Sequence, residues 1–150
     1  MEPRVNLSKS DPAAYAALLA MNKAASDSAD AAGIDPKLRE LLKVRASQIN
    51  GCTYCLRMHT RDALELGEST DRLSVVSAWA DSEYFTAVER AALALCESIT
   101  LVSVDHVPHG VYTMARAVLS DEQISAVAWL SAAINMFNRV AITSRYPVKP

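Results

Sequence analysis

The amino-acid sequence predicts an all-α fold, and three observations lead to this expectation. Apolar residues make up 51% of the 150 residues, alanine is prominent among them, and aromatic residues account for only 6%. Small apolar side chains favour closely packed helices, whereas β-branched and aromatic residues are enriched in strands. Helix-start signals recur along the chain, and no stretch alternates apolar and polar residues as a half-buried strand does. We therefore expect one domain, residues 1–150, built as a bundle of about six to seven helices.

Two Asp-Pro pairs mark the starts of the first two helices. In each pair the aspartate can cap the helix, while the proline fits the first turn, where no backbone N–H is needed. The first helix is expected from Pro12 to about Ala32, before Gly33. The second begins after Asp35, breaks at Asn50-Gly51, and carries apolar residues at helical spacing. These residues are Leu38, Leu41, Leu42, Ala46 and Ile49.

The middle of the chain predicts one clear helix and one short one. The clear helix is expected to begin at about Cys52 and to run to Leu66, where Gly67 can end it in a left-handed conformation. The segment that follows has weaker periodicity. We expect a short helix there, over about residues 71–80.

Two capping boxes mark the helices of the second half. Thr86 and Ser120 are each followed three positions later by Glu or Gln, whose side chain can close the box. Between these two helices, Pro108 lies in a loop that precedes a further helix over residues 109–119. The last helix is expected to reach about Ile142. The helix that follows Thr86 has a predicted core stripe of Val88, Ala91, Ala92, Leu95, Cys96 and Ile99.

Charge and hydropathy argue against several classes of partner. The net charge is −2, and the chain has no basic run and no basic patch interleaved with aromatic residues, so we expect no nucleic-acid partner. The first ten residues contain no apolar segment of the kind found in secretory signals. No apolar stretch approaches the roughly 20 residues that span a bilayer, so we expect no membrane association. A cytoplasmic location is the resulting prediction.

The three cysteines indicate thiol chemistry rather than a disulfide framework. An odd number of cysteines, in a chain without an apparent export signal, does not fit a set of structural disulfides. Cys52 and Cys55 form a C-x-x-C motif, which in such a protein indicates redox chemistry or metal binding. Cys96 falls on a predicted apolar stripe, where a packing role is favoured.

The C-x-x-C pair lies at a predicted helix start, together with a histidine. Cys52, Cys55 and His59 share one helix face because they are spaced by three and four residues. The free N–H groups and partial positive charge of a helix N-terminus stabilise a thiolate, the form that attacks peroxides and disulfides. A second thiol one turn away can condense with a sulfenic acid to form a disulfide. The spacing therefore suits a complete redox cycle.

The attacking cysteine stays open at this point. The helix dipole favours Cys52, which is nearer the N-terminus, whereas a base one turn away favours Cys55, because His59 can accept a thiol proton near neutral pH. Glu40 lies near the start of the preceding helix. If the two helices pack together, Glu40 can orient His59 or accept a proton itself. Taken alone, it would be a solvated glutamate of a first turn.

These residues resemble the core of a known family. Glu40 precedes Cys52 by twelve positions, residues 45–55 read RASQINGCTYC, and His59 follows Cys55 by four. This pattern is similar to that of the alkylhydroperoxidase D (AhpD) family within the carboxymuconolactone decarboxylase superfamily. The resemblance covers about residues 40–67 and includes nothing from residues 1–32. It extends more weakly to Arg145 through Glu89-Arg90 and through residues 134–135 and 138–139 of the last helix.

The resemblance implies a thiol-dependent peroxidase of the alkyl hydroperoxide reductase type, a peroxiredoxin-like oxidoreductase. By that resemblance Cys55 is peroxidatic, Cys52 resolves it, and Glu40 with His59 forms a proton relay. It also implies a homo-oligomer, trimer or hexamer. No bound cofactor is expected; electrons come from an external dithiol, which in the best-studied relatives is carried by a lipoylated protein. One departure is Tyr54, where those relatives carry a histidine, so the donor and the preferred peroxide stay open.

Two alternatives compete with the peroxidase. The same thiol pair can serve as a disulfide switch in a redox sensor that has no turnover. A zinc site built from Cys52, Cys55, His59 and Glu40 is the other, although ligands spaced along one helix without a second Cys or His pair make a poor structural zinc motif. For Asn135 and Asn138, polar residues in an otherwise apolar helix, we expect a structural role.

Overall fold

The computed structural model describes residues 2–150, and within them it contains nine α-helices, one 3-10 helix and no strand. The all-α class is therefore as predicted, but the expected number of six to seven helices was wrong. The seven expected helices correspond to α2 (Pro12–Ala31), α3 (Pro36–Asn50), α4 (Thr53–Glu65), α5 (Thr70–Val75) with the 3-10 helix η1 (Val76–Asp81), α6 (Ala87–Thr100), α8 (His109–Val118) and α9 (Asp121–Ser144).

The two additional helices are single turns of four residues. These are α1 (Leu7–Ser10) and α7 (Val102–Asp105). A single turn is too short to show a 3.6-residue apolar period, and neither has a buried residue, so pattern analysis overlooks both. The helix expected over residues 71–80 is split where Ala78 leaves helical geometry, with φ −120° and ψ 30°.

The predicted helix ends are confirmed in detail. The Asp11 and Asp35 carboxylates accept hydrogen bonds from the backbone N–H groups of Ala14 and Lys37, and both capping boxes are closed. Gly51 ends α3 with φ 67°, a left-handed conformation that costs other residues about 1 kcal/mol or more. One core prediction was wrong: Val88 is exposed, because the buried face of α6 begins at Ala91.

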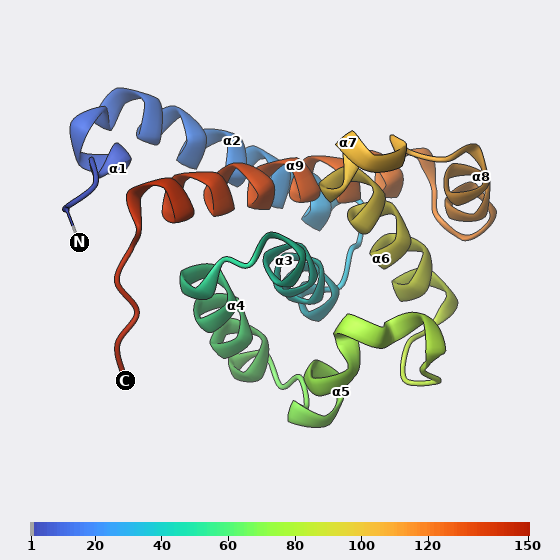
Figure 1. Ribbon diagram of the computed structural model, residues 1–150. Coiled ribbons are helices and arrows are strands. Elements are labelled where there is room, and N and C mark those ends of the chain that lie inside the picture. The colour runs from blue at the N-terminus through green and yellow to red at the C-terminus, as the bar shows by residue number, and fades with distance from the viewer. Residues whose placement is uncertain (1) are drawn as a thin grey trace.

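Helix α3 occupies the centre of the fold. It packs against α4, α6 and α9, and Figure 1 shows it nearly end-on beneath α9, with α4 and α6 on either side. Helix α2 lies along α9 and completes that layer. Leu41 and Leu42 of α3 are inaccessible to solvent, as are Leu93 and Leu130 within 1%. Burial on several faces of α3 fixes where its polar side chains lie.

None of the helices within residues 2–150 is both long and apolar enough to span a bilayer.

Candidate redox site

The two cysteines meet at the start of α4. Gly51 reverses the chain after α3, Cys52 becomes the N-cap of α4, and its Sγ accepts a hydrogen bond from the backbone N–H of Cys55 at 3.4 Å. The two sulfur atoms lie 2.7 Å apart, and both cysteines are free and buried. The two sulfurs are therefore close enough together for a disulfide to form between them.

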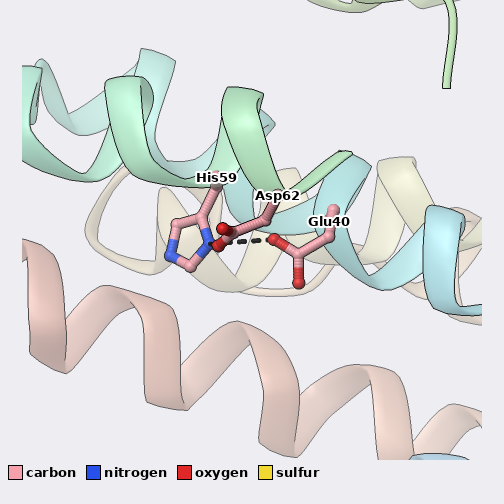
Figure 2. Close-up of side chains that lie close together, drawn as sticks. All are labelled: Glu40, His59 and Asp62. Atoms are coloured by element: carbon pink, nitrogen blue, oxygen red, sulfur yellow. Dashed lines mark hydrogen bonds and ion pairs between the residues drawn. The ribbon is translucent and has the colours of Figure 1, made fainter. Parts of the chain in front are cut away.

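Packing of α3 on α4 brings Glu40 to His59, as Figure 2 shows. Glu40 Oε2 lies 2.9 Å from His59 Nδ1, and both side chains are buried. Because a carboxylate can only accept, Nδ1 carries the proton in this hydrogen bond, and Nε2 is left able to accept another. Asp62, which is half exposed, lies 3.4 Å from the same Nδ1.

Lys43 neutralises the other oxygen of Glu40. Its Nζ lies 2.5 Å from Oε1, one turn along α3. Burial acts to raise the pKa of Glu40, but the hydrogen bond from His59 and the ion pair with Lys43 outweigh it, so the pKa is lowered from its ordinary value of 4.5. Glu40 is therefore a carboxylate at neutral pH, not the solvated first-turn residue of the simpler interpretation.

Burial has the opposite effect on Cys55. Removal from water, together with the adjacent Cys52 thiol, raises the pKa of Cys55 to about 12, although contact with Asn138 acts in the other direction. From the sequence, the helix N-terminus was expected to stabilise a thiolate. The burial of Cys55, which opposes this effect, is visible only in the structure. At neutral pH Cys55 is therefore a thiol, and it would have to lose its proton before its sulfur could act as a nucleophile.

This protonation state predicts how the reduced protein reacts with iodoacetamide. Alkylation of Cys55, followed by mass mapping, is expected to accelerate about tenfold per pH unit from pH 7 to pH 9 without a plateau, because only the thiolate reacts. A short cysteine peptide measured in parallel levels off near its ordinary pKa. A plateau for Cys55 below pH 8 would contradict the raised pKa.

Two asparagines of α9 hold the loop before Cys52. Asn50 Nδ2 donates to Asn135 Oδ1 and to Asn138 Oδ1, both at 2.9 Å, and Asn138 Nδ2 donates to Ser47 Oγ at 3.0 Å. These bonds tie the end of α3 to α9. Asn135 and Asn138 thus have the predicted structural role, because they hold in place the end of α3 that immediately precedes the cysteine pair.

An apolar pocket of about 240 Å³ opens beside Cys55 and His59. Its walls come from α2, α3, α4, α9 and the segment after α9. Sequence reasoning missed most of these residues, because no local signal links α2 to a motif some thirty positions later. The missed wall residues are Tyr15, Leu19, Asn22, Lys43, Met58, Phe137, Val140, Ala141 and Tyr146.

The zinc arrangement considered from the sequence does not form as a group. Within residues 2–150, the side chains close enough together to share a metal ion are Glu40, His59 and Asp62, without either cysteine. Lys43 already places a positive charge on Glu40, which opposes a divalent cation there. Cys96 is fully buried on α6, away from the pair, which fits the packing role expected for it.

A profile of the carboxymuconolactone decarboxylase family matches residues 12–98, more than half of the chain. The chain belongs to this family. The match begins at α2, so the sequence-based view that nothing in residues 1–32 relates to the family was wrong. The AhpD-like assignment within the superfamily is likewise supported by structural similarity.

Two relatives resemble the whole chain. The uncharacterized protein YdfG of Bacillus subtilis is 34% identical over 142 residues, covering 95% of this chain and 94% of that protein. A crystal structure of a protein of unknown function from Agrobacterium tumefaciens, with an assumed identity as antioxidant defence protein AhpD, has a TM-score of 0.89 and 32% identity, covering 99% of this chain and all of that one. A peroxidase-related protein from Silicibacter sp. TM1040 shares the fold alone, with a TM-score of 0.67, 24% identity, and coverage of 75% and 59%.

Proposed function

We propose that this family member is a thiol-dependent peroxidase that reduces small organic hydroperoxides through Cys55 and Cys52. One observation carries the proposal: of two adjacent free thiols, Cys55 lines an apolar pocket that also contains His59, a histidine held by a buried carboxylate. Membership of the family and the likeness to an AhpD-related structure agree with a peroxidase-related role.

In the first step Cys55 attacks the hydroperoxide. Because its pKa is raised, the thiol transfers its proton to His59 Nε2 as the sulfur attacks the terminal peroxide oxygen. The O–O bond breaks, and the alkoxide takes the proton from His59 Nε2 and leaves as an alcohol. The developing positive charge on His59 is stabilised by the Glu40 carboxylate at Nδ1. Cys55 is left as a sulfenic acid.

In the second step Cys52 resolves the sulfenic acid. Its sulfur attacks the sulfur of Cys55, the S–O bond breaks, and hydroxide leaves as water with the proton from Cys52. The short distance between the two sulfurs favours this reaction over further oxidation by a second peroxide. The product is a Cys52–Cys55 disulfide.

The disulfide is returned to two thiols by an external dithiol, and a lipoylated protein is the donor we propose from the family resemblance. We also propose a homo-oligomer. Trp129 and Met136, both on α9, are about half exposed, and exposed large apolar side chains of this kind are common at subunit contacts. Light scattering that finds only a 16.2 kDa species would contradict the oligomer.

The test is stopped-flow oxidation of the reduced protein by cumene hydroperoxide, with thiol counting and mass mapping. We expect loss of two thiols, formation of the Cys52–Cys55 disulfide, and continued turnover when a dithiol is added. The Cys96→Ser variant is the matched control and is expected to react like the wild type. A rate no faster than that of a free thiol would overturn the proposal, and a disulfide without dithiol turnover would indicate a redox sensor.

A further inference from the structure

The two cysteines face different pockets. Cys55 and His59 line the apolar pocket of about 240 Å³, which does not include Cys52. A second pocket of about 190 Å³ includes Cys52 and not Cys55. Its walls are Gly51, Cys52, Thr53, Tyr54, Ala141, Ile142, Arg145 and Tyr146.

An aromatic pair stands between the pockets. The rings of Tyr54 and Tyr146 meet edge to face with their centroids 5.1 Å apart, and both residues line both pockets. Tyr146 follows α9 and is held by a backbone hydrogen bond from its N–H to Ala141 O. The pair therefore forms, with Ala141, a wall that the two pockets share, and each pocket is lined by one of the two cysteines.

The two pockets differ in their linings. The Cys55 pocket is lined mainly by apolar side chains, which suits an organic hydroperoxide, and the charge of Lys43 in its wall is paired with Glu40. The Cys52 pocket is lined by Arg145, a cationic residue, and lies at the N-terminus of the 13-residue helix α4, where backbone N–H groups lack intrahelical partners. Both features favour an approaching anion, and a dithiol attacks a disulfide as a thiolate.

We propose that the two substrates enter by opposite sides: the hydroperoxide reaches Cys55 through the apolar pocket, and the dithiol reductant reaches Cys52 through the pocket beside Arg145. This inference rests on the proposed function for the role of the peroxide. The assignment of Cys52 as the sulfur attacked by the reductant concerns the disulfide alone.

The exchange proceeds in two balanced steps. A thiolate of the dithiol attacks Cys52 Sγ, forming a mixed disulfide and breaking the Cys52–Cys55 bond. Cys55 leaves as a thiolate and takes up a proton within its own pocket, which also contains His59. The second thiolate of the dithiol then attacks the reductant sulfur that is bonded to Cys52. Cys52 leaves as a thiolate and is protonated, and the reductant departs as a cyclic disulfide. Two electrons and two protons pass to the protein.

The first experiment identifies the attacked sulfur in the wild-type chain. The disulfide is made with diamide rather than peroxide, so the result does not depend on peroxidase activity. Oxidised protein is treated with thionitrobenzoate, released thiols are capped with N-ethylmaleimide, and the adducts are mapped by mass spectrometry. We expect thionitrobenzoate on Cys52 and maleimide on Cys55. The reverse pattern would overturn the proposal.

The second experiment blocks each pocket in turn. Thr53→Trp, at an exposed position of the Cys52 pocket, is expected to slow reduction of the diamide-oxidised protein by dihydrolipoamide by about tenfold or more. Leu19→Trp, at an exposed position of the Cys55 pocket, is the matched control and is expected to slow oxidation by cumene hydroperoxide instead. Equal slowing of reduction by both variants would indicate one shared entrance and overturn the proposal. If the wild type fails to react with hydroperoxide, the proposed peroxidase function is wrong. The reduction rates of the two diamide-oxidised variants still show through which pocket the reductant enters.

Discussion

Replacement of Cys55 by serine is expected to reduce hydroperoxide turnover to the uncatalysed background. Serine does not form a sulfenic acid, and Cys52 adjoins a different pocket from the one that contains His59. The fold should be retained, because serine is nearly isosteric with cysteine. Turnover measured with cumene hydroperoxide and dihydrolipoamide, beside circular dichroism for the fold, provides the check.

The Cys52→Ser variant separates the two thiol roles. With Cys55 intact, the first equivalent of peroxide should still be consumed, leaving a sulfenic acid that dimedone traps on Cys55. Steady-state turnover should be lost, since no disulfide forms. If Cys52→Ser abolishes the first oxidation and Cys55→Ser preserves it, the roles assigned to the two thiols are reversed.

Replacement of Glu40 by glutamine is expected to weaken both stability and activity. The buried carboxylate contacts Lys43 at 2.5 Å and His59 at 2.9 Å, and loss of its charge leaves Lys43 without its partner. Breaking a buried ion pair from one side costs about 3–5 kcal/mol, and this figure is an upper range here because Lys43 keeps some access to solvent. Oxidation by peroxide should fall about 10²-fold, because the histidine loses the charge that supports its protonation. Urea unfolding and stopped-flow oxidation measure the two effects.

The double variant Glu40→Gln with Lys43→Met is the control that separates the effects. Removal of both charges should restore much of the free energy of unfolding while oxidation stays slow. Full recovery of oxidation would mean that Glu40 acts through the fold alone.

The pH dependence of the free energy of unfolding provides a further test of the Glu40 carboxylate. Because the pKa of Glu40 is lowered by folding, its contribution is present above the ordinary pKa of 4.5 and is lost as the pH falls through the lower folded value. The difference in unfolding free energy between wild type and Glu40→Gln should therefore shrink below pH 4.5.

Caps and spacing predicted the seven longer helical segments and selected the cysteine pair and His59. Asp35, Gly51 and the capping boxes act locally, so their effect is visible in sequence. The meeting of Glu40 with His59 was conditional on packing of α3 against α4, and the resemblance rather than the spacing singled it out. That packing depends on apolar contacts made far along the chain.

Burial was the property that sequence could not supply. The C-x-x-C motif has the same sequence whether its thiols are exposed or buried. Burial nevertheless raises the pKa of Cys55, so this residue is a thiol at neutral pH. The pocket wall is similarly non-local: Tyr15 of α2 and Phe137 of α9 meet edge to face across some 120 positions. Single turns such as α1 and α7 lie below the length at which periodicity carries information.

The position of Tyr146 has a consequence for how such chains diversify. A ring that divides two cavities is supplied by a short extended tail rather than by a helix of the bundle. A substitution of Tyr146 would change the wall that the two cavities share, while Glu40, Cys55 and His59 belong to α3 and α4. That wall can therefore vary through a residue that follows α9, independently of the residues of the candidate redox site.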